Sequence, residues 1–230
     1  MKYKHLFFDL DHTLWDYDTN ARTSLYELYE RYGFEDRVPF TKEAMVDHFF
    51  LVNNGLWHEY NHGRLTREDL RVMRFPKVFN SLGAHESLVP SGLEEDYLEL
   101  CPTKKVVFDH THEVLDYLKP KYKLHIITNG FNGTQARKME SSGLAHYFEV
   151  VITSETAGYR KPDPRIFALA LERSSAEVEE SLMIGDNLTS DIGGARDFGM
   201  DQVFFNPHGL DNKDSVTHEI NSLKELKQLL

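Results

Sequence analysis

Four short motifs carry charged or hydroxyl-bearing residues that could do chemistry. Asp9-Leu10-Asp11-His12-Thr13 places two carboxylates two residues apart. The other motifs are Thr128-Asn129-Gly130, Arg160-Lys161-Pro162-Asp163 and Gly185-Asp186 with Asp191 beyond it. Carboxylates act as nucleophiles, proton donors and ligands for hard divalent cations, whereas lysine, hydroxyl and backbone N–H groups bind anionic oxygens. These residue types would be effective only if the fold brought them together.

Short apolar runs supply the elements that must position the motifs. The runs are His5 to Phe8, Leu124 to Thr128, Val150 to Thr153, Leu182 to Ile184 and Val203 to Phe205. Runs that are apolar on both faces and alternate with helical patterns predict an α/β fold, a doubly wound (Rossmann-like) parallel sheet. The carboxyl ends of parallel strands line one crevice, so motifs that are distant in sequence should meet there.

Helix signals lie between these runs. Asp163-Pro164 predicts an N-cap and a first helical residue, and glycine is expected to close the helices at Ser142-Gly143 and Phe198-Gly199. The segment from Glu219 to Leu230 is predicted to form a terminal helix. From Leu14 to about Leu100 the strand-like runs are absent and helical spacing dominates. The expected domains are therefore a core of residues 1–16 and 101–230 and a helical cap of residues 17–100.

Composition narrows the class of protein. The 230 residues are 40% hydrophobic, which is enough for a sizeable core, and carry a formal charge of −11 from 26 basic and 37 acidic residues. That balance disfavours nucleic-acid polymers and anionic membranes as partners. Cys101 is the only cysteine, which excludes an intramolecular disulfide and fits a reducing compartment. No stretch approaches the roughly 18 apolar residues of a membrane span, so we expect a cytoplasmic protein.

Each motif also has a simpler interpretation. A strand-end aspartate can cap the next helix, Lys161 can be a solvated surface charge, and Thr128 can satisfy local backbone groups. All four motifs together favour a site, because unpaired buried carboxylates would be strongly unfavourable without a metal ion or a cation.

In their order and spacing, the four motifs resemble those of the haloacid dehalogenase superfamily. The resemblance implies that Asp9 attacks phosphorus and that Asp11 acts as general acid and then general base. It also implies Mg²⁺ held by the Asp9 carboxylate, the Asp11 backbone carbonyl and the Asp186 carboxylate, with Asp191 holding a metal-bound water or the lysine. Asp11 distinguishes the chain from the dehalogenases, which lack an acidic residue at that position.

The same resemblance assigns roles around the phosphoryl group. Thr128, by its hydroxyl, and Asn129, by its backbone N–H, would bind phosphoryl oxygens. Lys161 would neutralise charge on the equatorial oxygens in the transition state, and Thr13 would support the loop geometry. The insertion resembles the helical cap of the first subclass, which closes over the crevice and selects small-molecule phosphomonoesters.

Within the insertion, Asn53 to Gly63 followed by Arg74-Phe75 resembles the cap of bacterial pyrimidine 5′-nucleotidases that act on noncanonical nucleotides. Asn53 or Asn54 could hydrogen-bond the edge of a base, and Trp57 or Tyr60 could stack on it. The helical spacing of the aromatic residues favours the alternative that most of them form the core of the cap. His12, beside the nucleophile, could line the leaving-group site or face solvent.

The function expected from these features is a Mg²⁺-dependent phosphomonoesterase that acts as a 5′-nucleotidase on pyrimidine nucleoside monophosphates. A sugar-phosphate or phosphoglycolate phosphatase with the same core is the alternative enzyme. A non-catalytic binding protein on the same fold is the alternative from another class. The oligomeric state does not follow from the sequence.

Overall fold

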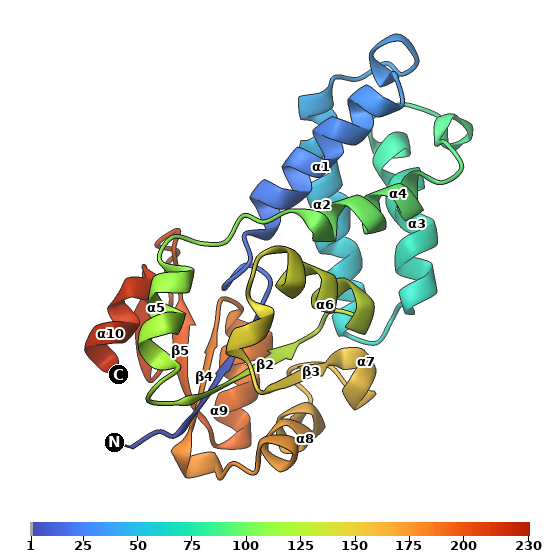
Figure 1. Cartoon of the computed structure of the whole chain (residues 1–230). Helices are drawn as coiled ribbons and strands as arrows, with labels where there is room; N and C mark the ends of the chain where they lie inside the picture. Colours follow the sequence, from blue (N-terminus) through green and yellow to red (C-terminus); the bar gives the residue numbers. More distant parts are fainter. Residues whose placement is uncertain (1) are drawn as a thin grey trace. The chain divides into compact units, whose positions relative to one another are not determined.

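A computed structural model describes residues 2–230, and its fold divides into two units (Figure 1). An α/β unit comprises the described residues up to Tyr17 together with Lys105–Leu230, and a helical unit comprises Asp18–Lys104. The insertion that the sequence predicts covers residues 17–100.

Six parallel strands form the sheet of the α/β unit. They are β1 (His5–Phe8), β2 (Lys123–Thr128), β3 (Val150–Thr153), β4 (Ser181–Gly185), β5 (Asp201–Phe205) and β6 (His218–Ile220). Their order is β3-β2-β1-β4-β5-β6, with β1 central and paired to both β2 and β4. The doubly wound parallel sheet expected from the apolar runs is confirmed.

Helices cover both faces of the sheet (Figure 1). The helices of this unit are α5 (Thr111–Leu118), α6 (Asn132–Ser141), α7 (Ser154–Ala157), α8 (Pro164–Ser174), α9 (Gly194–Phe198) and α10 (Leu226–Leu229). Helices α8 and α9 pack against each other, as do α5 and α10. Phe7, Ile127 and Met183 from three strands join Ile166 and Phe167 of α8 in a solvent-excluded core. This core fixes the strands whose carboxyl ends carry the motifs.

The predicted caps are present. The Asp163 side chain accepts a hydrogen bond from the backbone N–H of Arg165 at 3.0 Å, and Pro164 begins α8. Helix α6 ends before Ser142 and α9 ends at Phe198; the glycines that follow, Gly143 and Gly199, have φ of +72° and +90°. Glycine adopts this left-handed conformation without the strain that a Cβ would cause.

The prediction of a terminal helix from Glu219 to Leu230 is wrong for its first residues. Instead, His218–Ile220 forms β6, which pairs with β5 and buries Ile220. A capping box at Ser222 then starts the 3-10 turn Leu223–Glu225, which leads into α10. Pairing with an available sheet edge therefore outweighs the local helical pattern.

Four longer helices build the other unit: α1 (Tyr17–Arg31), α2 (Lys42–Asn61), α3 (Arg67–Ser81) and α4 (Leu93–Leu100). Helices α2 and α3 pack against each other, with Phe49, Phe75 and Phe79 buried. Thr41 and Thr66 cap the starts of α2 and α3 by accepting backbone hydrogen bonds. The unit therefore has an apolar core of its own.

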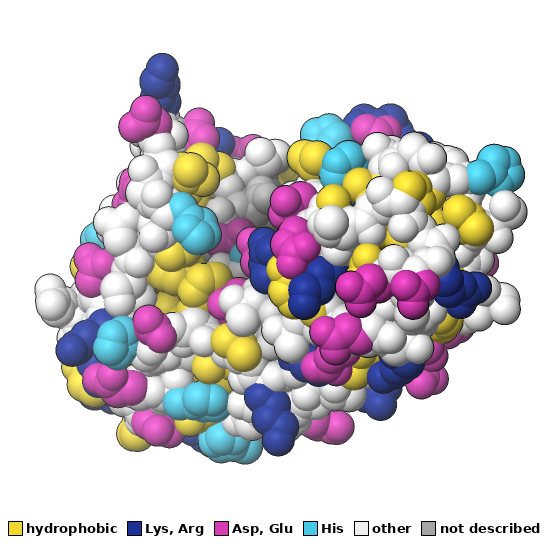
Figure 2. Space-filling view, turned by 90° about the horizontal axis from the view of Figure 1, so that it is seen from above, with side chains coloured by type: hydrophobic (Ala, Val, Ile, Leu, Met, Phe, Trp, Pro, Cys, Tyr) yellow, Lys and Arg dark blue, Asp and Glu magenta, His cyan; other side chains and the backbone are white. Residues whose placement is uncertain are grey.

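The surface shows no single dominant charge on the face seen in Figure 2, where acidic and basic side chains are interspersed. A broad basic area, which a nucleic-acid polymer would need, is missing from that face. Among residues 2–230 no helix is both long enough and apolar enough to cross a membrane.

A pair of histidines lies inside the sheet. Nδ1 of His5 on β1 is 3.1 Å from Nε2 of His125 on β2, and the rings stack with centroids 5.3 Å apart. His125 is fully buried, and burial, helped by His5 and Lys123, lowers its pKa to about 4. His125 is therefore neutral in the native protein near pH 7.

We expect this buried imidazole to make the fold sensitive to acid. Because its pKa in the fold lies below the ordinary 6.5, its contribution to stability is present above pH 6.5 and is lost as the pH falls towards 4. At about 1.4 kcal/mol per pKa unit, the loss is up to about 3 kcal/mol. Denaturant unfolding of wild type and His125→Phe between pH 7 and 4 should show a shallower pH dependence in the variant. The exposed His208→Phe is the matched control, and an unchanged slope in His125→Phe would contradict the assignment.

Candidate active site

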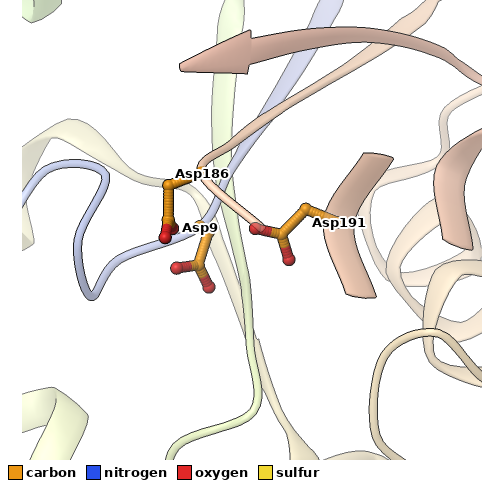
Figure 3. Close-up of side chains that lie close together, drawn as sticks. All are labelled: Asp9, Asp186 and Asp191. Atoms are coloured by element: carbon orange, nitrogen blue, oxygen red, sulfur yellow. The ribbon is translucent and has the colours of Figure 1, made fainter. Parts of the chain in front are cut away.

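Three aspartates converge at the carboxyl ends of the central strands (Figure 3). Asp9 follows β1, Asp186 follows β4, and Asp191 lies in the π-helical segment Leu188–Gly193. One carboxylate oxygen from each lies within 4.8 Å of the others. The topology thus brings Asp9 together with two acids that lie more than 170 residues further along the sequence.

Lys161 lies among these acids. Its Nζ is 2.6 Å from Asp9 Oδ1 and 2.7 Å from Asp191 Oδ1, and it donates a hydrogen bond to the Ile127 carbonyl. The side chain is only 2% exposed. Burial opposes the positive charge on Lys161, but Asp191 and Asp9 outweigh it and raise its pKa. Lys161 is therefore a fixed cation in contact with Asp9.

One lysine does not balance three carboxylates. Burial raises the pKa of Asp9 well above its ordinary value; Lys161 opposes this, and Asp191 and Asp186 add to it. Burial and the nearby Asp191 raise the pKa of Asp186 to about 7. Oxygen donors with this excess of negative charge are what a hard divalent cation binds. The donor set therefore fits a metal ion.

The Gly-Asp motif provides the space that Asp191 needs. A Cβ added at Gly185 would lie 2.6 Å from both Cβ and Cγ of Asp191, closer than real contacts allow. The Asp191 carboxylate also accepts hydrogen bonds from the Asn187 N–H and the Ser190 hydroxyl, each at 3.1 Å. Asp191 is thus held on one side by its own turn and on the other by Lys161.

Thr13 and Asn129 order the surroundings of the acids. The Thr13 hydroxyl, fully buried, donates to Asp186 Oδ1 at 3.0 Å and so links the first motif to the last. The Asn129 side chain accepts from the Lys161 N–H at 2.7 Å and donates to the Lys161 carbonyl at 3.0 Å. Asn129 therefore fixes the backbone that carries the lysine, a contact that the sequence motif does not indicate.

Thr128 ends β2 and is buried beside the same site. Its Oγ1 accepts hydrogen bonds from the Gly130 N–H at 3.2 Å and from Gln135 Nε2 at 2.7 Å. Both bonds use its acceptor capacity, so the hydroxyl proton is available to an anionic oxygen.

Asp11 has two partners that the motifs did not reveal. Lys138 Nζ lies 2.6 Å from Asp11 Oδ1, and Gln135 Nε2 donates to Asp11 Oδ2 at 2.9 Å. Burial alone would raise the pKa of Asp11, but Lys138 and the hydrogen bonds from Lys138 and Gln135 lower it below its ordinary value. Both partners lie on α6, three residues apart and so on one helix face. That spacing, directly after the Thr128 loop, is the signal that could have identified them.

The residues suggested for substrate specificity belong to different units. His12 lies in the α/β unit with φ of +62°, and its ring centroid is 5.0 Å from that of Tyr17. Asn53 and Trp57 lie on α2 of the helical unit, where Asn53 is 2% exposed and Trp57 is half-buried against Tyr60. Their role in specificity stays a prediction.

A family model and full-length relatives match this chain. The model of the haloacid dehalogenase-like hydrolases matches residues 3–199. The pyrimidine 5′-nucleotidase PynA of Streptococcus pneumoniae is 32% identical over 100% of this chain and 96% of its own length. The pyrimidine 5′-nucleotidase YjjG of Escherichia coli is also 32% identical, over 100% of this chain and 99% of its own.

A solved structure extends the likeness to three dimensions. The HAD-hydrolase YfnB of Bacillus subtilis, crystallised with magnesium, superposes with a TM-score of 0.87 at 30% identity, covering 100% of this chain and 99% of that one. A family match over most of the chain, full-length relatives above 30% identity and the same fold all agree. The chain belongs to the haloacid dehalogenase-like hydrolase family.

Proposed function

We propose that the chain is a Mg²⁺-dependent phosphomonoester hydrolase that acts through a covalent phosphate on Asp9. The observation that carries the proposal is the buried Asp9 carboxylate, 2.6 Å from the fixed cation Lys161 and two residues before a second held carboxylate, Asp11. Phosphate-monoester hydrolysis is among the slowest uncatalysed reactions, with required accelerations of up to ~10²¹-fold. A carboxylate nucleophile divides it into two easier displacements.

In the first displacement an Asp9 oxygen attacks phosphorus and the bond to the leaving oxygen breaks. The negative charge of the bound phosphoryl group favours the protonated form of Asp11 and so opposes the effect of Lys138. Asp11 donates this proton to the leaving oxygen, which departs as an alcohol. Lys161 and the Thr128 hydroxyl stabilise the charge that collects on the equatorial phosphoryl oxygens. In the second displacement Asp11 takes a proton from water, the water oxygen attacks phosphorus, and Asp9 is released with inorganic phosphate.

The residues that would hold Mg²⁺ are Asp9 and Asp186 through their carboxylates and Asp11 through its backbone carbonyl, with Asp191 adjacent. When bound, the ion supplies positive charge that offsets the repulsion between the Asp9 carboxylate and the phosphoryl oxygens. The donor set supports this assignment, because buried carboxylates with raised pKa values lack sufficient positive charge of their own.

We further propose pyrimidine nucleoside monophosphates as the substrates, that is, small-molecule phosphomonoesters. The proposal is supported by the full-length similarity to the pyrimidine 5′-nucleotidases of S. pneumoniae and E. coli. Phosphate release should be measured on nucleoside monophosphates, sugar phosphates and phosphoglycolate, each with Mg²⁺ and with EDTA. Mg²⁺-dependent preference for pyrimidine nucleotides is the expected result. Activity only on sugar phosphates or phosphoglycolate would discard the nucleotidase assignment, and inactivity on every compound would favour a binding protein.

Asp11→Asn should reveal the proton transfer. Only a poor leaving group needs a proton, so the variant should lose about 10²- to 10⁴-fold in kcat/KM on an alkyl ester such as uridine 5′-monophosphate. On p-nitrophenyl phosphate the leaving group departs as a stable anion and needs no proton, so the loss of kcat/KM should stay below about tenfold. Equal losses on the two esters would contradict Asp11 as the general acid.

A further inference from the structure

Lys138 of α6 is a buried lysine whose charge lies against Asp11. Its side chain is 6% exposed, and its Nζ is 2.6 Å from Asp11 Oδ1. Burying an ammonium group is costly unless it is paired, and a lysine that served only solubility would extend into water. The burial of Lys138 and its contact with Asp11 therefore indicate a role that involves Asp11.

Two aromatic rings confine the ammonium group. Lys138 Nζ lies 4.6 Å from the centroid of the Trp15 ring and 5.5 Å from that of the Tyr17 ring. A cation is attracted to the face of an aromatic ring, and the attraction is stronger when the cation is shielded from water. Both rings come from the segment that follows Asp11, so the same short stretch of chain supplies the carboxylate and the walls around its partner.

Gln135 holds the other oxygen of the same carboxylate. Its Nε2 donates to Asp11 Oδ2 at 2.9 Å and to Thr128 Oγ1 at 2.7 Å, and the residue is fully buried. A Cβ at Gly130 would collide with the Gln135 side chain, so the glycine leaves the space in which the amide lies. One amide group thus connects the Asp11 carboxylate to the Thr128 hydroxyl.

We propose that Lys138 is a positioning residue for proton transfer by Asp11, assisted by Gln135. With one oxygen held by Lys138 and the other by Gln135, the Asp11 side chain cannot rotate away from the leaving oxygen. Fixed geometry of this kind accounts for large parts of catalytic rate enhancements. Asp11 alone gives and takes the proton, and Lys138 acts only through the position of Asp11. The inference rests on the proposed phosphatase function.

The test compares two esters in Lys138→Met, Lys138→Arg and, as a matched control, Arg137→Met, which changes an exposed neighbour on the same helix. The parameter is kcat/KM, which reports the steps up to departure of the alcohol and excludes hydrolysis of the phosphoenzyme. Lys138→Met should lose about 30-fold or more on uridine 5′-monophosphate and no more than about threefold on p-nitrophenyl phosphate, with the alkyl loss mainly in kcat. Lys138→Arg should recover part of the loss, and the control should match wild type on both esters.

A double-mutant cycle identifies the residue through which Lys138 acts. In an Asp11→Asn background, Lys138→Met should cause less than about a twofold further loss, because coupled residues are not additive. A crystal structure of Lys138→Met grown with EDTA should show the Asp11 carboxylate displaced from Gln135, and unfolding curves should show an intact fold.

Several results would overturn the proposal. Equal losses on the two esters would mean that Lys138 is a phosphate-binding or purely structural residue. If the loss of kcat/KM in the double variant equalled the product of the losses in the two single variants, Lys138 would act independently of Asp11. An unshifted Asp11 in the crystal structure would also overturn it. If wild type hydrolyses no phosphomonoester at all, the proposed function fails, whereas the crystal structure still decides whether Lys138 holds Asp11.

Discussion

Replacing Asp9 with Asn should lower kcat by about 10⁵-fold or more on every substrate, because an amide cannot form the covalent phosphate. The substitution keeps the size of the side chain and changes only its nucleophilicity and charge. Wild type, quenched in acid during turnover of a ³²P-labelled substrate, should carry label on the protein, and Asp9→Asn should carry none. Asp197→Asn is the matched control, since that aspartate is largely exposed on α9.

Measurements of stability distinguish the loss of the nucleophile from the loss of the fold in Asp9→Asn. The raised pKa of Asp9 means that the native protein disfavours its carboxylate, so the contribution of Asp9 to stability is present at acid pH and is lost as the pH rises above the ordinary value of 3.8. Asparagine has no such dependence. In EDTA at pH 8 we therefore expect Asp9→Asn to unfold at a denaturant concentration equal to or above that of wild type. Substantial residual turnover, or label on the variant, would mean that another residue is the nucleophile.

Burial of the strands on both faces explains why the fold was predictable. Leu6 and Phe7 are both fully buried although they point to opposite faces of β1, so the strand reads as an unbroken apolar run. Strand β6 lacks this signature because it lies at the edge of the sheet and only Ile220 is buried there. A three-residue edge strand carries too little pattern to compete with the helical spacing that follows it.

Topology explains why part of the site was predictable. Once the motifs are placed at the carboxyl ends of parallel strands, the meeting of Asp9, Asp186 and Lys161 follows from the strand order. The contacts of Lys138 and Gln135 do not follow, because polar residues on a helix ordinarily face water. Only the packed structure shows that this face of α6 lies against Asp11.

The helical unit shows what the helical spacing of residues can and cannot predict. Phe49, Asn53, Leu56 and Tyr60 recur at helical spacing on α2, and all four are buried. The pattern therefore identifies one buried face that includes an amide. It does not identify what that amide binds, because specificity depends on side-chain contacts that spacing alone leaves open.

Replacing Lys161 with Met should affect activity and stability together. Lys161 is the cation that faces Asp9 and Asp191 at 2.6 and 2.7 Å, so its loss leaves buried carboxylates without compensation. Removing one partner of a buried ion pair costs about 3–5 kcal/mol. Loss of a charge that stabilises the transition state should lower kcat/KM by about 10³-fold. Denaturant unfolding in EDTA and steady-state kinetics measure the two effects.

The pH dependence and a second substitution separate these effects. Without Lys161 the pKa values of Asp9 and Asp186 rise further, so the stability deficit should be smaller at pH 5, where protonation weakens the repulsion, and larger at pH 8. Adding Asp191→Asn to Lys161→Met removes one uncompensated charge and should restore part of the stability without restoring activity. Recovery of activity in the double variant would show that Lys161 serves only to neutralise Asp191. A stability deficit independent of pH would mean that Lys161 acts through packing, because repulsion among carboxylates must weaken when they are protonated.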